Sequence, residues 1–284
     1  MHTTIETLPI DGTLVRTMRV EPETTPRGVV QFVHGFGEHI GMYEAMAGFF
    51  ADHGYAFVIH DQRGHGEMPE LTPALRKKAL GVADYSKFLS DITAIRQRID
   101  DWYGEAPVIL GGLSMGGNIV ADYIELTPEP RFVKAIIESP WLRLAKPMPG
   151  IVTAIARFVG SITPKVAISA GLDLDAITRD PEETAKVKND PFYHGRISFK
   201  LYAQILDAGE YAIAHAADIK VPTLLMTGTA DRIVSVDAIR ELAAGAGPNL
   251  QLVEYEGAFH ALHQETNRAE VMEAMLAFCE QPLG

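Results

Sequence analysis

A glycine-flanked serine between an apolar run and a helix-forming stretch restricts the fold of this chain more than any other feature. The pentapeptide G-L-S-M-G at 112–116 follows the apolar run 108–111 and precedes 118–124, which has the composition of a helix. A serine in a tight strand-to-helix turn needs glycine on both sides, because a Cβ atom there would collide with neighbouring backbone. The G-x-S-x-G spacing also arises by chance in glycine-rich loops. The flanking strand and helix favour a nucleophilic Ser114.

Apolar strands alternate with helical stretches along most of the chain. The strands are apolar throughout instead of at every second residue, which is typical of a parallel sheet covered on both faces. We therefore predict an α/β fold, with a mostly parallel central sheet, helices on both faces and an opening hairpin formed by the first two strands. The pattern predicts strands at 13–20, 28–33, 55–60, 108–111, 133–138, 221–228 and 250–255, and helices at 43–53, 85–103, 118–124, 236–244 and 268–279.

The alternation stops between residues 141 and 217. This stretch contains helical patches and turn residues but no clear strand. An interruption that returns to the same pattern is most simply a helical insertion at the carboxyl edge of the sheet, where active-site loops also lie. We therefore expect a core made of residues 1–140 and 218–284, and an inserted helical cap, or lid, made of 141–217.

The cap contains the most apolar stretch of the chain, 151–162. It is shorter than the ~20 residues that a membrane-spanning helix needs. Its polar residues Thr153, Arg157 and Ser161 form a thin stripe at helical spacing. An ordinary buried helix would explain this pattern. On an insertion with little core of its own, a hydrophobic substrate or a transient contact with a membrane surface would explain it equally well.

Two polar residues downstream of Ser114 follow predicted strands. A serine hydroxyl is a weak nucleophile at neutral pH, so it needs a base within hydrogen-bond reach and a third group that fixes the tautomer of that base. Asp231 comes just after the strand 221–228, and His260 just after 250–255. Asp231 alone could be a turn or helix N-cap residue. The order serine, acid, histidine favours Ser114, Asp231 and His260 as catalytic residues.

Asp237 and His263 are the alternatives for the acid and the base. His263 comes three residues after His260 and could face the same way, and Asp237 follows the same strand as Asp231. Both lie deeper in predicted helices, where they would point less directly at the edge of the sheet. We therefore expect His263 to be a packing residue or a residue that supports the site.

Acyl transfer also requires hydrogen-bond donors for an oxyanion. The backbone N–H of Met115, at the start of the helix after Ser114, is one candidate. The glycine-rich loop after an early strand, H-G-F-G at 34–37, would supply the N–H of Phe36. Such a loop could also be a plain turn. Together with the serine turn, it favours an oxyanion hole, in which each donor is typically worth ~3 kcal/mol.

Composition excludes several classes of function. The formal net charge of −12 argues against a nucleic-acid partner, because phosphate binding needs basic stripes. The single cysteine, Cys279, cannot form an internal disulfide and is expected to be a small buried side chain. The first residues lack the basic and apolar regions of a secretory signal, so we expect a cytoplasmic protein.

No ligand pattern for a metal ion or a cofactor is found in the sequence. There is no H-E-x-x-H motif, no cysteine pair and no histidine cluster with ligand spacing. The loop D-Q-R-G-H-G at 61–66 lacks the spacing of phosphate-binding loops, so we expect it to be a tight, hydrogen-bonded turn. We therefore expect neither a metal nor a cofactor.

Five short segments carry a family pattern that covers nearly the whole chain. They are H-G-F-G-E-H at 34–39, H-D-Q-R-G-H-G at 60–66, G-L-S-M-G-G at 112–117, G-T-A-D at 228–231 and H-A-L-H-Q-E at 260–265. This pattern resembles the monoacylglycerol lipase and lysophospholipase branch of the α/β-hydrolases, which are often labelled serine aminopeptidase S33-like. The first two loops are the specific part, since G-x-S-x-G occurs throughout the superfamily.

The resemblance implies the α/β-hydrolase fold, a triad of Ser114, Asp231 and His260, an oxyanion hole made by the amides of Phe36 and Met115, and a helical cap over an acyl-chain tunnel. It implies a serine esterase for single-chain lipid esters, monoacylglycerols first and lysophospholipids second. A small-ester carboxylesterase, a carbon-carbon bond hydrolase and a peptidase use the same triad. A non-catalytic ligand receptor on a hydrolase fold is the alternative from another class.

Overall fold

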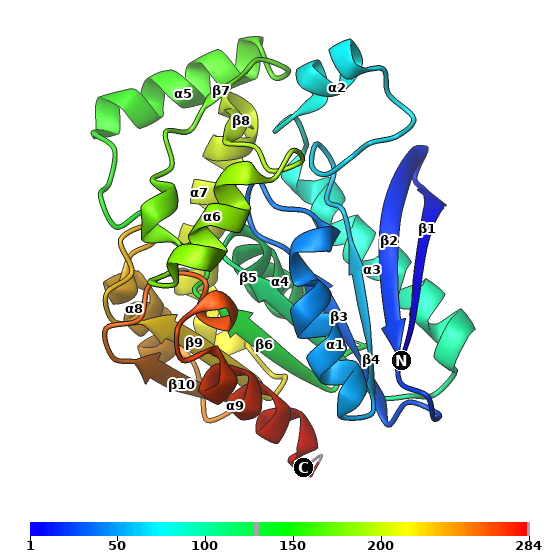
Figure 1. The fold of residues 1–284 in the computed structure, drawn as a ribbon. Coiled ribbons are helices and arrows are strands. Elements are labelled where there is room, and N and C mark those ends of the chain that lie inside the picture. The colour runs from blue at the N-terminus through cyan, green and yellow to red at the C-terminus, as the bar shows by residue number, and fades with distance from the viewer. Residues whose placement is uncertain (128–130, 283–284) are drawn as a thin grey trace.

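An eight-stranded sheet forms the centre of the protein (Figure 1). The computed structural model describes residues 1–127 and 131–282. The strand order is β1-β2-β4-β3-β5-β6-β9-β10, in which β1, β2 and β4 pair antiparallel and all later neighbours pair parallel. The strands are β1 (His2–Ile10), β2 (Thr13–Glu21), β3 (Gly28–Val33), β4 (Tyr55–His60), β5 (Val108–Leu113), β6 (Lys134–Glu138), β9 (Thr223–Gly228) and β10 (Leu250–Tyr255).

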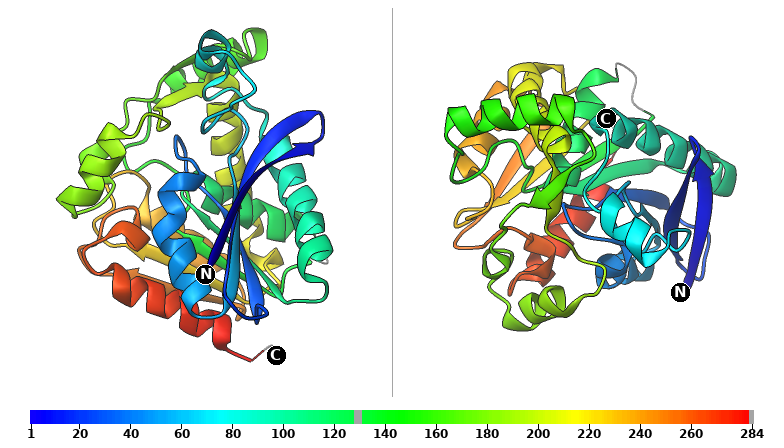
Figure 2. Two further views of the ribbon diagram at one scale, coloured as in Figure 1. Left: turned by 45° about the vertical axis from the view of Figure 1, so that its right-hand side comes forward. Right: turned by 90° about the horizontal axis from the view of Figure 1, so that it is seen from above.

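Helices cover both faces of this sheet (Figures 1 and 2). One buried apolar cluster joins one sheet face to α3, α4, α7 and α8, and a second joins the other face to α1 and α9 and includes Cys279. The predicted α/β fold is therefore confirmed. The helices are α1 (Glu44–Asp52), α2 (Pro73–Ala79), α3 (Tyr85–Tyr103), α4 (Met115–Leu126), α5 (Gly150–Ile162), α6 (Pro181–Asn189), α7 (Phe199–His215), α8 (Val236–Gly245) and α9 (Arg268–Glu280).

The predicted opening hairpin is wrong in its partners. The first hairpin pairs β1 with β2, whereas β3 lies between β4 and β5 in the sheet. The strand β1 was not predicted, because most of its residues are polar and exposed, as expected for a strand at the edge of a sheet. Without it, the nearest predicted strand along the chain, β3, was the expected hairpin partner of β2.

The stretch 141–217 lies between β6 and β9 and covers the carboxyl end of the parallel strands, with α5 farthest from the two chain termini (Figure 1). It contains two short paired strands that were not predicted, β7 (Ala167–Ser169) and β8 (Arg196–Ser198). Three residues are too few to show a strand pattern in the sequence. Helix α7 also belongs to the stretch 141–217, but its buried residues share one apolar cluster with those of α4 and α8.

No helix among the described residues has both the length and the apolar character needed to cross a bilayer.

Candidate functional site

Ser114 lies in a sharp turn between β5 and α4. Its φ of 55° is in the left-handed region, which side-chain-bearing residues rarely adopt. A Cβ atom added to Gly112 would lie 2.6 Å from the backbone of Gly116, and one added to Gly116 would lie 2.0 Å from the carbonyl oxygen of Val33. The turn therefore requires glycine at both positions. The reason is the Cβ clash that the G-x-S-x-G spacing predicted.

Asp231 and His260 lie side by side at the carboxyl edge of the parallel strands, where Ser114 also lies. The Nδ1 atom of His260 is 2.7 Å from Oδ2 of Asp231, so Nδ1 donates this hydrogen bond, and in the neutral ring Nε2 carries no proton. The other carboxylate oxygen of Asp231 accepts from the amides of Ile233 and Val234 at 2.7 and 3.0 Å. Asp231 is thus both a turn residue and the partner of the imidazole. Such a pair can position an unprotonated nitrogen for proton transfer.

The charge environment of His260 favours a protonated ring. Burial by itself lowers the pKa of a histidine, but the Asp231 carboxylate, together with Glu38 and Glu138, outweighs it and raises the pKa of His260 above its ordinary value of 6.5. An imidazole with a raised pKa holds a transferred proton more firmly. This property suits a general base that must accept a proton.

His263 and Asp237 lie elsewhere. His263 donates from Nδ1 to the fully buried Glu138 at 3.0 Å and stacks on Tyr43, with the ring centroids 5.1 Å apart. Asp237 lies on α8 with its side chain exposed and pairs with Arg240. The packing role expected for His263 is confirmed. Glu138 was not singled out from the sequence, because it looked like the last residue of an ordinary strand.

The loop after β3 is held by a relay of hydrogen bonds. The amide of Gln62 donates to Nε2 of His34 at 2.9 Å, so Nδ1 carries the proton and donates to the carbonyl oxygen of Gly35 at 2.8 Å. Burial lowers the pKa of His34 to about 3, which keeps the ring neutral. Because the peptide unit is planar and trans, a Gly35 carbonyl turned toward His34 directs the N–H of Phe36 the opposite way.

The buried carboxylate of Glu38 stabilises the same loop. Glu38 accepts from the amide of Gly35 at 2.7 Å and from the hydroxyl of Tyr43 at 2.6 Å. Among the described residues, the Phe36 amide donates to no backbone or side-chain acceptor. The amide of Met115, at the first position of α4, has no partner within the helix. Two free N–H groups are therefore available near Ser114.

The loop 61–66 is the hydrogen-bonded turn that we expected. His65 donates its amide to the carbonyl of Gln62 at 2.9 Å, and Arg63 forms a bidentate pair with the fully buried Asp91. The side chain of Gln62 also donates to the carbonyl of His34. This loop thus fixes the loop after β3.

A cavity of about 220 Å³ lies beside these groups. Ser114, His260, Gly35 and Phe36 line it. Most of the remaining wall is apolar and comes from the stretch 141–217, including Trp141, Leu144, Met148, Ala156, Ile168 and Ile197. A pocket with one polar end and an apolar wall fits a ligand with one polar and one apolar part.

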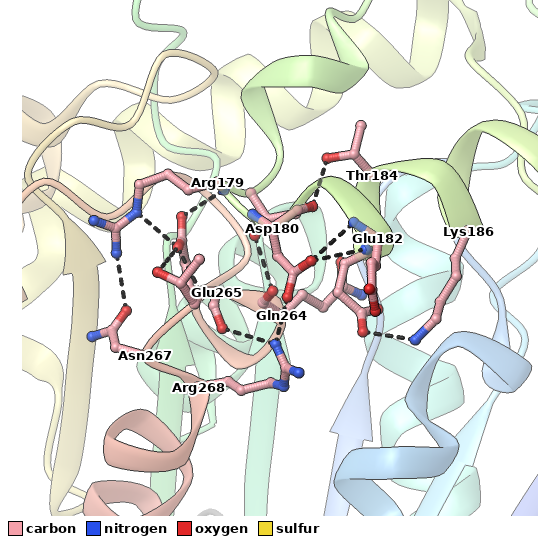
Figure 3. Close-up of polar contacts among 12 residues, drawn as sticks. Arg179, Asp180, Glu182, Thr184, Lys186, Gln264, Glu265, Asn267 and Arg268 are labelled. Carbon is pink, nitrogen blue, oxygen red and sulfur yellow. Dashed lines mark hydrogen bonds and ion pairs between the residues drawn. The ribbon is translucent and has the colours of Figure 1, made fainter.

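The buried carboxylate of Glu265 holds the loop that carries His260, and Figure 3 shows its contacts with Arg179. Glu265 accepts from the amide of Phe259 at 2.9 Å and from the amide and Nε of Arg179 at 3.0 and 2.8 Å. The amide of His260 itself donates to the carbonyl of Ile177 at 3.1 Å. The residues 177–179 therefore fix the position of the His260 loop, a contact between segments more than 80 residues apart that no local pattern could predict.

A mostly parallel sheet with a glycine-flanked serine after β5, an aspartate after β9 and a histidine after β10 defines an α/β-hydrolase. The sequence profile of the family described as serine aminopeptidase, S33, matches residues 24–267. The chain belongs to this family.

Individual relatives agree with this classification. The monoacylglycerol lipase of Mycolicibacterium smegmatis is 30% identical over 254 residues, which are 89% of this chain and 88% of that protein. Phospholipase YtpA of Bacillus subtilis is 26% identical over 90% of this chain and 96% of its own length. The crystal structure of monoacylglycerol lipase from Paleococcus ferrophilus has a TM-score of 0.82 and 29% identity, and the match covers 92% of this chain and 96% of that one.

Proposed function

We propose that this chain is a serine hydrolase that cleaves carboxylic esters of single-chain lipids, with monoacylglycerols as the preferred class. The observation that carries the proposal is the cavity itself, in which the serine turn and the His260 ring meet an apolar wall. The monoacylglycerol lipases among its relatives support the choice of substrate class. An enzyme of this kind releases glycerol and a fatty acid.

In the proposed mechanism, Ser114 attacks the ester carbonyl while Nε2 of His260 accepts its proton. The amides of Phe36 and Met115 donate to the oxyanion of the tetrahedral intermediate. His260 then protonates the leaving alcohol, and a water molecule repeats the sequence on the acyl-enzyme. Asp231 orients the imidazole through the 2.7 Å bond at Nδ1 and stabilises its charged form.

The nucleophile is tested with a fluorophosphonate probe. We expect the native protein to be labelled and Ser114→Ala to be unlabelled. The control is Ser169→Ala, which removes a different hydroxyl from the wall of the same cavity and is expected to keep the label. An unlabelled native protein would favour a non-catalytic ligand receptor on the hydrolase fold.

The substrate class is tested by comparing hydrolysis of monoacylglycerols, lysophospholipids and p-nitrophenyl esters of increasing acyl length. We expect medium and long acyl chains to be preferred to acetyl, because the cavity wall is apolar. A lysophospholipase is the second candidate, supported by the relative named as a phospholipase. A sharp preference for acetyl esters would instead indicate a general carboxylesterase.

We propose that the stretch 141–217 acts as the cap of this site and that its outer face contacts lipid surfaces transiently. Ile151, Ile155, Phe158 and Ile162 recur at helical spacing along α5 and are 54–69% exposed. The cavity wall residues Met148 and Ile168, close to α5 in the chain, are also partly exposed. An apolar path from the surface into the cavity would suit a lipid substrate. A cytoplasmic location remains a prediction from the sequence.

A further inference from the structure

The segment Asp190–His194, between α6 and β8, lies directly against the loop 34–39. The amide of His194 donates to the carbonyl oxygen of Gly37 at 3.0 Å. Gly37 has a φ of +81°, and a Cβ atom at this position would lie 2.2 Å from the carbonyl oxygen of His194. The two backbones are therefore in contact, with no space for a side chain between them.

The two carboxylate oxygens of Asp190 stabilise this contact through different partners. Its Oδ1 accepts from the amides of Phe192 and Tyr193 at 2.7 and 3.0 Å, which closes the turn. Its Oδ2 lies 2.8 Å from Nε2 of His39. Since Nδ1 of His39 accepts from the amide of Gly41 at 3.2 Å, Nε2 carries the proton and donates to Asp190. One carboxylate thus connects the turn 190–194 to the end of the loop 34–39.

The N–H of Phe36 lies between two carbonyl groups that are each held in place. On the core side, His34 holds the carbonyl of Gly35 at 2.8 Å. On the cap side, His194 holds the carbonyl of Gly37 at 3.0 Å, and its ring packs edge-on against Phe36 with the centroids 6.0 Å apart. The Phe36 N–H shares a rigid peptide unit with the Gly35 carbonyl, so releasing that carbonyl would let the unit rotate. Releasing the Gly37 carbonyl would free the backbone torsions of Phe36 and Gly37, which link the two held peptide units. The direction of the Phe36 N–H therefore depends on the stretch 141–217 as well as on the core.

We propose that Asp190 is a positioning residue for the oxyanion hole: through His39 and the turn 190–194 it keeps the Phe36 N–H directed at the reacting carbonyl. This inference rests on the proposed function. It makes the segment 190–194 a permanent part of the catalytic machinery and not a piece of a lid that leaves the core.

The test is Asp190→Asn, measured with a p-nitrophenyl ester of a medium-chain acid. Loss of a whole oxyanion donor costs ~10²–10³-fold in kcat, so a loosened donor should cost about tenfold, with KM changed less than about twofold. An alkylboronic acid, whose tetrahedral adduct with serine places an oxygen in the oxyanion hole, should lose affinity by the same factor as kcat. A purely structural role would not produce this match.

Asp180→Asn is the matched control (Figure 3). Like Asp190, Asp180 accepts from two amides of its own turn, those of Glu182 and Glu183 at 2.9 and 3.4 Å. It also pairs with a basic residue of the core, Arg268, at 2.7 Å. It does not contact the loop 34–39. We expect Asp180→Asn to leave kcat and the boronic acid affinity unchanged.

The outcomes separate this inference from the proposed function. If the native protein reacts with a fluorophosphonate but Asp190→Asn keeps its kcat, or if both aspartate variants lose kcat equally, the role of Asp190 is overturned. If the native protein does not react, the proposed function fails. The variant His39→Ala repeats the test from the core side should Asp190→Asn not fold. Since both residues act in one path, the double variant should be no slower than the slower single variant.

Discussion

In the proposed mechanism, His260 accepts the proton of Ser114 only while its ring is neutral, so we expect its pKa to set the acid limb of activity. Burial lowers this pKa, but Asp231 and the two glutamates raise it above 6.5. Because the neutral form is the active one, kcat/KM should fall as the pH drops, with a midpoint above 6.5. In Asp231→Asn we expect this midpoint to move down and kcat to fall by about 10⁴-fold, because the ring loses the partner that fixes its tautomer.

The measurement is a profile of kcat/KM between about pH 5 and pH 9 for the native protein and the variant. Asp237→Asn is the control, since it removes an exposed carboxylate that follows the same strand as Asp231. We expect no shift of the midpoint there. A midpoint that stays in place in Asp231→Asn, or moves equally in both variants, would contradict the assignment of the acid.

At the residue scale, the sequence predicted the groups that follow strand ends and missed the groups that support them. Ser114, Asp231 and His260 could be chosen because the carboxyl ends of parallel strands meet at one edge. Glu138 and Glu265 could not, because their roles depend on contacts with residues such as His263 and Arg179, far away in the chain. The same holds for His34, whose ring is oriented by the amide of Gln62.

At the scale of elements, α5 exposes an apolar stripe that we expect to bind lipid surfaces. Replacing Phe158, 67% exposed on this stripe, by glutamate would place a charge where an aromatic ring enters the lipid. Losing the burial of a phenylalanine side chain costs about 1.5–3 kcal/mol, so binding of Phe158→Glu to zwitterionic vesicles should weaken about tenfold or more. Hydrolysis of a short soluble ester should be unaffected.

Vesicle sedimentation measures this binding, with Ser161→Glu as the control. Ser161 lies on the same helix and is also exposed, but it belongs to the thin polar stripe. We expect Ser161→Glu to bind vesicles much as the native protein does. Equal loss in both variants would mean that added negative charge alone is responsible, and no loss in Phe158→Glu would mean that the stripe does not meet lipid.

Element prediction succeeded where the apolar pattern was long and failed where it was short or at an edge. The helix at 85–103 was predicted with its observed bounds, because its apolar residues keep helical spacing over five turns. The strands β7 and β8 have three residues each. In β1, exposed residues alternate with less exposed ones along most of the strand, so no long apolar pattern forms. Which strands pair is decided by packing over the whole sheet, which explains why the partner of β2 was predicted wrongly.

At the scale of the whole molecule, the division into a core and an inserted cap remains a prediction. Helix α7 belongs to the stretch 141–217, yet it shares its apolar cluster with α4 and α8. The contacts of residues 177–179 with the His260 loop, and of 190–194 with the loop 34–39, likewise join this stretch to the core. Any opening of the cap would therefore have to be carried by α5 and the segments next to it.

The stability of the whole molecule should depend on two buried carboxyl groups on α4. Asp122 and Glu125 are almost fully buried, and oxygens of both find no hydrogen-bond partner among the described residues. Burial raises the pKa of Asp122 to about 7 and, with Asp122 and Asp218 nearby, that of Glu125 to about 9. Both groups thus keep their protons in the folded protein at pH values where the unfolded chain has lost them.

This difference has a definite sign. Above about pH 4 the unfolded state ionises first, so each group costs up to ~1.4 kcal/mol of stability per pH unit until its folded-state pKa is reached. A neutral amide of the same shape removes that cost. We therefore expect Glu125→Gln to raise the free energy of unfolding by about 2 kcal/mol or more at pH 8 and to change it little near pH 4.

Urea unfolding at the two pH values measures the effect, with Asp101→Asn, an exposed carboxylate on α3, as the control expected to gain little at either pH. Because the charge on Asp122 is one cause of the raised pKa of Glu125, the gains of Asp122→Asn and Glu125→Gln should not be additive. A gain of equal size at both pH values would trace the stabilisation to better packing of the amide. No gain at pH 8 would mean that the folded protein already holds these carboxyl groups in their charged form.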